Sequence, residues 1–433
     1  MGGGLLQLVA YGAQDAYLSG NPQITFWRGL FKRHTNFAME PFRINMTGQA
    51  SWGTKHSAIL GRHADLVSSA YIEVELQYDE TGTLLYQDKG RLSAFNLIEY
   101  AELDIGGQII DRQYGEFLFL WSQLAHNVDV RANMDLMAKT IDNQNATCDE
   151  TTGRPFRKNI TYIPLMFFFC RNPGAALPLI ALQYHEVKIN ILWNKVRQIF
   201  TGGVSSVGPA QANLLIDYVY LDVEERRRMA QESHEYLIEQ TQFNEDKGLT
   251  SAQNRVDLTF NHPVKELIWV TQYSWRRNCT ITPPVGLAVS PLTYDALLHE
   301  CSLQLNGQDR VPSLPGTYYA AVQPYQHHSG RGFTDGEVLV PNGFSTFSPA
   351  PTTDDRKLAG GVYMYSFAIK PEEHQPSGTC NFSRIDTATL VFSVDGKKQV
   401  SNTDMYNADI RVYAINYNIL RVMSGMGGLA YSN

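Results

Sequence analysis

The sequence predicts an all-β fold of two tandem eight-stranded antiparallel jelly rolls (a double jelly roll), with a few short helices in loops and at the N-terminus. Three observations support this prediction. The 433-residue chain is rich in Tyr (23) and Phe (20) but only 18% charged, short runs alternate between apolar and polar residues, and three patterns recur nearly 200 residues apart. Aromatic residues favour strands, and a chain of this length can bury two substantial cores.

Alternating runs near both ends of the chain predict strands with one face in a core. Over residues 72–78, Ile, Val, Leu and Tyr alternate with Glu and Gln, and over 409–414, Ile, Val and Ala alternate with Asp, Arg and Tyr. Neighbouring residues of a strand point to opposite faces, so we expect the intervening polar residues to face water. Helices are predicted only over Ile24–His34, after Asn21-Pro22, and from Tyr114 to Lys139.

The most informative pattern is a repeated strand and turn. Leu103–Gln108 returns as Leu303–Gln308, 200 residues later. In both copies an alternating strand runs into a two-residue Gly-Gly or Asn-Gly turn, which is typical of a β-hairpin. The chain therefore repeats at least one supersecondary unit.

Two further patterns repeat in the same order. An aromatic residue followed by two prolines five residues apart occurs over 168–178 and again over 367–376, and the segments Leu214–Asp222 and Ile410–Asn418 each close one half of the chain. Each match alone would be weak, but a common order at a nearly constant spacing indicates an internal duplication.

The duplication predicts a first jelly roll over residues 35–225 and a second over 226–433. The boundary falls at the charged stretch Glu224–Arg228, which we expect to be a salt-bridged link between the domains. About 200 residues in each half suit an eight-stranded jelly roll better than an immunoglobulin sandwich, which needs about 100. Tyr325–Leu358, rich in Gly, Ser, Thr and Pro, is predicted to be a loop.

Charge and hydropathy exclude several classes of protein. The net charge of −7 at pH 7 argues against direct nucleic-acid binding, which needs clustered Lys and Arg. The longest apolar runs fall short of the roughly 18 to 20 residues that cross a bilayer, so we expect no transmembrane segment. The five cysteines form no C-x-x-C pair, so neither a zinc site nor a redox site is expected.

Candidate catalytic and metal-binding groups are weak, so we expect no enzymatic activity, no catalytic residue, no metal and no cofactor. His185-Glu186 lies in a predicted strand, where neighbours point apart, and we expect His234-Glu235 to serve packing. His327-His328 lacks further ligands at a defined spacing. Asp104 and Asp309 flank turns, and a glycosidase using two such carboxylates stays open as a weak alternative.

Five N-x-[ST] sequons are candidate glycosylation sites. Without a secretory signal they need not meet the ordinary glycosylation machinery, and chance explains most of them. Asn278 is the candidate that we retain. The five asparagines are Asn45, Asn145, Asn159, Asn278 and Asn381.

Specific strings along the whole chain resemble the major capsid proteins of large icosahedral nucleocytoplasmic DNA viruses, closest to the chlorovirus (phycodnavirus) type. The amino-terminal signature is Gln7–Asp15 followed by Gly20–Phe26. The similarity continues through both halves, in Leu177–Val187, His234–Gln240, Leu305–Arg310, Pro376–Asp386 and Met423–Tyr431.

The resemblance implies a structural protein of the virion whose homotrimers form pseudo-hexameric capsomers that tile an icosahedral capsid. It implies neighbouring capsomers and minor capsid proteins as partners, and synthesis and assembly in the host cytoplasm. Residues 1–34 would then be an assembly segment lying beneath the capsomer. Its candidate assembly residues are Trp27, Arg28, Phe31, Lys32 and Arg33.

The loops Tyr325–Leu358 and Val394–Asn407 depart from the family pattern. There the resemblance implies covalent glycans and contacts with the host cell surface. Chlorovirus-type shells are similar to one another in carrying glycans outside the usual sequon, so the sequons are poor guides. The alternative function that the sequence leaves open is a carbohydrate-binding jelly-roll protein, because many Tyr and Trp residues fall in predicted loops.

Overall fold

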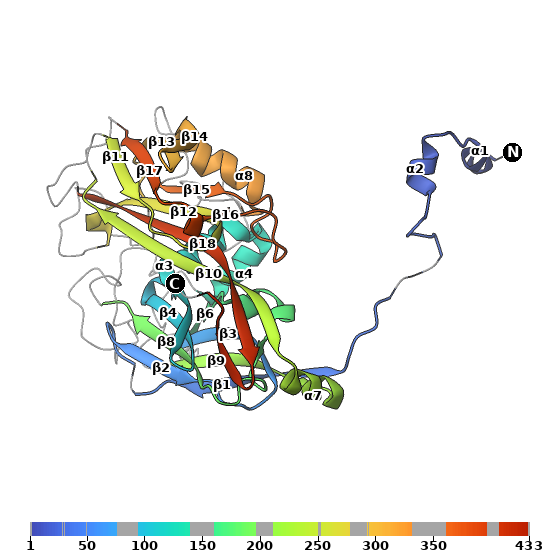
Figure 1. The fold of residues 1–433 in the computed structure, drawn as a ribbon, viewed down its shortest axis with the longest axis horizontal. Coiled ribbons are helices and arrows are strands. Elements are labelled where there is room, and N and C mark those ends of the chain that lie inside the picture. The colour runs from blue at the N-terminus through green and yellow to red at the C-terminus, as the bar shows by residue number, and fades with distance from the viewer. Residues whose placement is uncertain are drawn as a thin grey trace, which may run out of the picture. The chain divides into compact units, whose positions relative to one another are not determined.

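Figure 1 shows the chain in a computed structural model. The structure describes residues 2–27, 29, 31–48, 50–75, 94–138, 160–195, 211–249, 253–277, 292, 294–330, 361–395 and 407–431. The chain divides into two units, Met1–Phe37 and Ala38–Asn433. The first unit holds helices α1 (Gly3–Val9) and α2 (Asp15–Ser19), and no residue of either helix is buried.

The first half of the second unit is a jelly roll of two antiparallel sheets. Their strand orders are β1-β9-β3-β6 and β2-β8-β4-β5, and the two-residue strand β7 (Leu177–Pro178) pairs with β3. The eight longer strands are β1 (Phe37–Asn45), β2 (Lys55–Ile59), β3 (Leu66–Glu75), β4 (Ile98–Ile105), β5 (Gln108–Tyr114), β6 (Ile160–Pro164), β8 (Val187–Trp193) and β9 (Gln211–Leu221).

The second half repeats this arrangement. Its sheets have the orders β10-β18-β12-β15 and β11-β17-β13-β14, while β16 (Cys380–Asn381) pairs with β12 and β19 (Met426–Leu429) pairs with β18. The eight longer strands are β10 (His234–Lys247), β11 (Gln253–Asp257), β12 (Pro263–Tyr273), β13 (Leu298–Leu305), β14 (Gln308–Pro315), β15 (Val362–Ser366), β17 (Ala388–Val394) and β18 (Ala408–Met423).

The two halves have one topology. When the longer strands of each half are counted along the chain, both pairs of sheets read first-eighth-third-sixth and second-seventh-fourth-fifth. The repeated strand and turn forms the hairpin β4–β5 in one half and β13–β14 in the other, and the repeated closing segments are the last long strands, β9 and β18. The predicted double jelly roll is confirmed.

The helices differ from the sequence prediction in two places. The expected helix from Tyr114 to Lys139 is two helices, α3 (Gly115–Ala125) and α4 (Val128–Met137), because the Asn127 side chain caps α4 by accepting a hydrogen bond from the Val130 amide. The prediction of a helix over Ile24–His34 is wrong for the described residues there, which are not helical. A short helix needs an apolar face to pack, and the apolar side chains of this stretch are exposed.

Short helical turns occupy several connections. Two of them, η5 and α8, follow β14 as one continuous run, as α3 follows β5. The short turns are η1 (Ala94–Leu97), α5 (Phe168–Arg171), η3 (Pro173–Ala175), η4 (Ser274–Arg276), the π-helical η5 (Tyr318–Val322), α8 (Gln323–His327) and η6 (Phe382–Arg384).

Helix α7 (Val223–Gln231) joins the two jelly rolls. The expected salt bridges are present: Arg226 binds the buried Asp65 of the first jelly roll at 2.9 Å, and Arg228 binds Glu232 at 3.0 Å. Asp222 caps the helix through its side chain. The charged stretch is therefore a short helix fixed to the first jelly roll.

Each jelly roll has a core between its two sheets. Residues such as Ile72, Leu103 and Ile216 fill the first core, and Leu267, Leu303 and Val412 fill the second. The prediction that the opposite strand faces are wet is wrong at Glu73, Arg411 and Tyr413, which are buried. Glu73 pairs with Arg43, while α3 covers the face of Arg411 and Tyr413.

Candidate functional site: the junction between the jelly rolls

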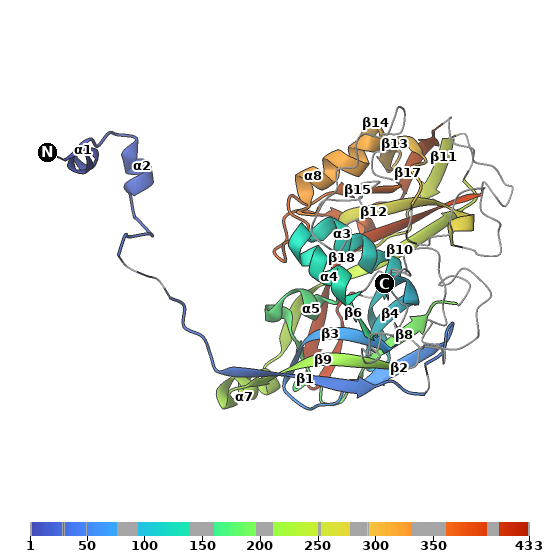
Figure 2. The same ribbon diagram turned by 180° about the vertical axis from the view of Figure 1, so that it is seen from behind.

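Helix α3 packs against both jelly rolls, and Figure 2 shows it between their sheets. Its Leu118 side chain lies in the first core. The other apolar face packs on the outer face of sheet β10-β18-β12-β15. A helix that is apolar on two faces must be covered on both. The residues of this contact are Phe117, Leu120, Trp121 and Leu124 on α3, and Ile268, Val270, Val362, Met364, Tyr413 and Ile415 on the sheet.

A buried ion pair lies within this apolar contact. Glu116 of α3 accepts hydrogen bonds from Arg411 Nε at 2.7 Å and Nη2 at 2.8 Å, and a third from the Tyr413 hydroxyl at 2.5 Å. Burial alone would raise the pKa of Glu116, but the Arg411 charge and these hydrogen bonds lower it to about 2. The bidentate geometry fixes the orientation of α3 on the sheet.

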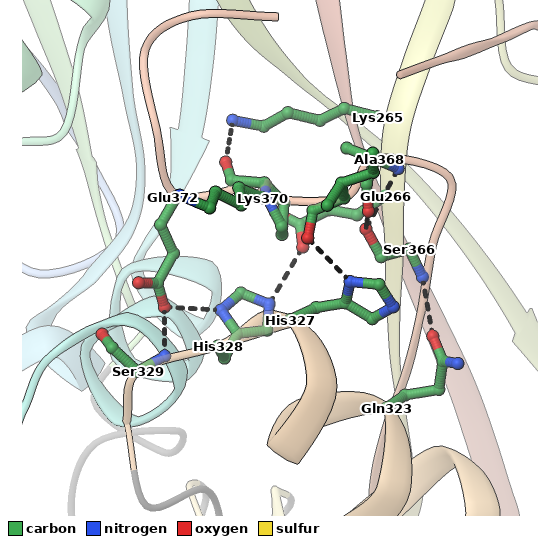
Figure 3. Close-up of polar contacts among 12 residues, drawn as sticks. Lys265, Glu266, Gln323, His327, His328, Ser329, Ser366, Ala368, Lys370 and Glu372 are labelled. Carbon is green, nitrogen blue, oxygen red and sulfur yellow. Dashed lines mark hydrogen bonds and ion pairs between the residues drawn. The ribbon is translucent and has the colours of Figure 1, made fainter. Parts of the chain in front are cut away.

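A second polar cluster lies at the C-terminal end of α3 and is drawn in part in Figure 3. His328, after α8, is held between two carboxylates: its Nε2 lies 3.0 Å from Glu266 Oε2, and its Nδ1 lies 2.9 Å from Glu372 Oε1. Burial alone would lower the pKa of His328, but the charges and hydrogen bonds of Glu266 and Glu372 raise it to about 9. His328 is therefore an imidazolium at neutral pH.

The same cluster contains two more cations and one more carboxylate. Glu239 binds Arg171 of the first jelly roll and lies 2.7 Å from Lys265 Nζ, which also donates to the Pro371 carbonyl at 2.6 Å. Burial lowers the pKa of Lys265 although Glu239 opposes it. Arg171 and Lys265 also lie over the Trp121 ring, at 4.5 and 5.7 Å from its centroid. Both jelly rolls thus contribute charges to one cluster.

The cluster is suited to holding the domains together. Its three cations, with His328 protonated, balance the three carboxylates of Glu239, Glu266 and Glu372. The His328 side chain is 0% exposed. Ser329 and Gly330 continue the link by donating to the carbonyls of Ala125 and Leu124.

The β18–β19 hairpin makes the reverse contact, from the second half onto the first jelly roll. The Gly425 carbonyl accepts a hydrogen bond from the Tyr184 amide at 2.9 Å, and the Gly427 amide lies 3.2 Å from His185 Nδ1. Gly425 has a φ of 79°, and a Cβ there would lie 2.5 Å from the Tyr184 ring, so only glycine fits. His185 thus packs against this hairpin, but the prediction that His185-Glu186 lies in a strand is wrong, because β8 begins only at Val187.

The first core also includes side chains from the second half. Ile238 of β10 and Leu420 and Val422 of β18 belong to that core. The predicted packing role fits His234, which is half-buried and lies 2.9 Å from the Met229 carbonyl, whereas Glu235 is exposed and pairs with Arg421 at 2.7 Å on the surface. Strand β18 therefore contributes side chains to both cores, and β10 pairs with it along its whole length.

A cavity of about 330 Å³ opens on the outer face of sheet β1-β9-β3-β6. Its walls combine apolar side chains with Arg171, His126 and Glu372. The lining residues are Ser69, Ala70, Tyr71, Trp121, Ala125, His126, Pro164, Leu165, Met166, Cys170, Arg171 and Glu372.

The candidate assembly residues lie apart from this junction in the sequence. Trp27 and Phe31 are 91% and 85% exposed, and Lys32 and Arg33 are exposed. Arg28 lies outside the described residues, as do the glycosylation candidate Asn278 and the sequons at Asn145 and Asn159. Asn45 and Asn381 are exposed.

The described part of the chain offers neither a metal site nor a membrane span. It holds no group of three or more His, Cys, Asp or Glu side chains able to bind a metal ion. Among the described helices, none is long and apolar enough to cross a membrane.

Sequence reasoning missed the residues that make the junction. Glu116 and Arg411 are 295 residues apart, and the two carboxylates on His328 come from positions 62 and 44 residues away. Pairs of residues so far apart leave no pattern in the local spacing of the sequence. The available signal was the apolar character of α3 on all sides, since Gly115–Ala125 contains only one charged residue.

Two family models match the chain. The model for "Major capsid protein N-terminus" matches residues 25–222, and the model for "Large eukaryotic DNA virus major capsid protein" matches residues 225–336 and 344–428. The chain is 44% identical over 436 residues to the major capsid protein of Pyramimonas orientalis virus and 39% identical over 477 residues to that of Paramecium bursaria Chlorella virus 1. In both cases the alignment covers 100% of each chain.

Solved structures give the same match. VP54 of PBCV-1, fitted into a reconstruction of the virophage Sputnik, superposes with a TM-score of 0.75 at 34% identity, over 94% of this chain and 100% of that one. A quasi-atomic model of the PBCV-1 capsid matches with a TM-score of 0.74. The Faustovirus major capsid protein, at 11% identity and a TM-score of 0.66, shares the fold.

Proposed function

We propose, from the premise that this chain belongs to the family of large eukaryotic DNA virus major capsid proteins, that three copies form a pseudo-hexagonal capsomer. The chain is a structural component of the virion capsid, and the proposal concerns how it builds that shell. Such capsomers would tile the flat facets of an icosahedral particle. Closed threefold symmetry buries the same surface in each copy.

The observation that carries the proposal is the duplicated topology. Both jelly rolls have the strand orders first-eighth-third-sixth and second-seventh-fourth-fifth. Three chains would therefore present six similar domains around one axis, with nearly equivalent edges toward the neighbouring capsomers. The match to the PBCV-1 capsid, at 34% identity over 94% of this chain, supports a role in such a lattice.

The N-terminal segment is proposed to contact neighbouring capsomers and minor capsid proteins. Its helices α1 and α2 bury no residue, although the segment carries large apolar side chains such as Leu8, Tyr17 and Trp27. Exposed apolar side chains gathered in one segment mark a surface that a protein partner covers. Synthesis and assembly in the host cytoplasm belong to the same proposal.

No catalytic step is proposed for this chain. The buried histidine of the junction is sealed from solvent and paired on both nitrogens. The reported relatives are capsid proteins, so they lend no support to the alternative of a carbohydrate-binding jelly-roll protein. Covalent glycans and host contacts on the outer loops, and the acceptor role of Asn278, stay part of the proposal. Intact-mass spectrometry of virion protein tests the glycans.

The capsomer is tested on the purified chain by light scattering coupled to size exclusion, followed by negative-stain imaging. We expect a particle of three chain masses with threefold symmetry and a hexagonal outline. A preparation that stays monomeric at all concentrations would contradict the proposed capsomer.

A further inference from the structure

We infer that the helical run Tyr318–His327 of one copy packs on the outer face of sheet β1-β9-β3-β6 of a second copy. This contact would repeat, between chains, the contact that α3 makes within the chain. The inference rests on the proposed capsomer and names the surfaces that form it.

The helical run after β14 corresponds to α3. Gly115 and Gly316 begin the two helical segments at equivalent places: a Cβ on Gly115 would lie 2.4 Å from the Ile98 carbonyl oxygen, and a Cβ on Gly316 would lie 2.6 Å from that of Leu298. Ile98 and Leu298 are the first residues of the equivalent strands β4 and β13. The two glycines therefore align the starts of the two helical segments.

The alignment gives the same inward face to both helices. It pairs Leu118 with Tyr319, and each of these side chains is 0% exposed in the core of its own jelly roll. Leu118 and Tyr319 were not used to make the alignment, so their equal burial supports it. The remaining faces can then be compared.

The face that α3 buries is exposed on the second helix. Counted from the glycines, Phe117, Leu120, Trp121 and Leu124 of α3 match Tyr318, Ala321, Val322 and Tyr325. The π-helical turn Tyr318–Val322 rotates the later positions relative to those of α3, and Tyr318 packs against the second core. The Tyr325 side chain is 88% exposed and that of Val322 is 40% exposed, while Tyr318 is half-buried. Among the described residues, no element covers this apolar face as the sheet covers its counterpart on α3.

The matching receptor is the first sheet of the first jelly roll. The register of strand pairing shifts after Val67 in β3 and after Val264 in β12. Because the shift occurs at the same place in both sheets, the two strands can be aligned on it. Tyr71 and Leu215 then form the cross-strand pair that corresponds to Ile268 and Tyr413.

The two receptor faces differ in exposure. Ile268 and Tyr413 are buried beneath α3. Tyr71 and Leu215 are only half-buried. Among the described residues, the first jelly roll therefore leaves partly exposed the cross-strand pair whose counterpart the second jelly roll covers with a helix.

A cavity lies at the corresponding point of the receptor. The 330 Å³ cavity is lined by Ser69, Tyr71 and Pro164, which correspond to Glu266, Ile268 and Met364 of the second jelly roll. On the second jelly roll α3 packs at Ile268 and Met364. Its lining also includes Trp121 and Ala125 of α3 and Glu372 of the second half, so the cavity lies where the receptor sheet meets this chain's own junction, beside the place proposed for the helical run of another copy.

The polarity of the two surfaces also fits. Ser69 donates a hydrogen bond to Asp217 on the receptor face, where the second jelly roll has Glu266 beside Ile415. A tyrosine at 325, in place of the Leu124 of α3, brings a hydroxyl to this more polar face. Three copies related by threefold symmetry would close a ring of six helix-on-sheet contacts, three within chains and three between them.

The test uses Tyr325→Asp and Val322→Asp in the full chain, with Val130→Asp as the matched control, since Val130 of α4 is similarly exposed at 44%. We expect both test variants to lose the trimer and elute as monomers with an unchanged circular dichroism spectrum, and the control to stay trimeric. Trimers that persist in both test variants would overturn the contact and leave the proposed capsomer standing. An unmodified chain that never trimerises would contradict both the contact and the proposed capsomer.

A second measurement does not depend on a destabilising variant. p-Benzoylphenylalanine in place of Tyr325 should give, on irradiation, covalent dimers and trimers whose cross-linked peptides contain β3, β6 or β9. Cross-links confined to other strands would overturn the assignment even if trimers form.

Discussion

The carboxylate of Glu116, in the first jelly roll, binds the guanidinium of Arg411, in the second, through two hydrogen bonds of 2.7 and 2.8 Å. Both side chains are buried within an apolar contact. This pair links the domains, so removing it measures how much the stability of each domain depends on its contact with the other.

Replacing Glu116 by Ala should destabilise the chain strongly. Arg411 would stay buried without its partner, which costs about 3 to 5 kcal/mol in the free energy of unfolding. The double variant Glu116→Leu/Arg411→Met should recover most of this loss, because no charge is left unpaired. Urea denaturation measures both. The exposed pair Glu235–Arg421 is the control, and Arg421→Ala should change little. Equal losses in the single and double variants would contradict this account.

The free energy of unfolding should fall as the pH rises from about 6.5 to 9. The pKa of His328 is raised from 6.5 to about 9 in the folded chain, so the folded state holds a proton that the unfolded state has released. The resulting stabilisation is complete below pH 6.5 and is lost through pH 9. His328→Gln should flatten this dependence, measured by urea denaturation at several pH values. His299→Gln, an exposed position on β13, should retain it.

Trp121→Ala should weaken the junction between the domains. Trp121 packs in the apolar contact and lies beneath the cations of Arg171 and Lys265. Loss of a buried Trp side chain costs about 3 to 5 kcal/mol in the free energy of unfolding. Trp121→Phe should lose clearly less, since a ring remains for both contacts. Calorimetry should show a lower melting temperature for the Ala variant, and an unchanged one would exclude a stabilising role.

Deleting residues 2–34 should leave the melting temperature of the remaining chain unchanged, because α1 and α2 bury no residue. The same deletion should abolish the association of capsomers into larger shells, measured by sedimentation. A control that removes only residues 2–9 separates α1 from the aromatic stretch around Trp27. Loss of folded protein on deletion would show that the segment stabilises the domains.

The duplication could be predicted because the turns preserve their chemistry. Gly106 and Gly107 have φ values of 62° and 89°, and Asn306 and Gly307 have 51° and 76°. A two-residue hairpin turn of this kind needs positive φ at both positions, which Gly and Asn tolerate best. Such a requirement is local, so it is visible in six residues of sequence.

The junction could not be predicted because its partners are distant in the chain. Arg411 alternates with apolar residues as a solvent-facing residue would, and only the arrival of Glu116 makes it a buried one. The expectation for Ile24–His34 failed for a related reason: local helix signals do not report whether a covering surface exists. His328 looked like a loop histidine until Glu266 and Glu372 were placed beside it.

The presence of Leu420 and Val422 in the first core has a consequence for synthesis on the ribosome. The first jelly roll emerges early, yet its core lacks these side chains until nearly the whole polypeptide has been translated. Nascent domains that fold from the N-terminus onward would here wait for the last long strand. A truncated product would therefore expose an incomplete core. Only full-length chains would fold into subunits that can assemble into a shell.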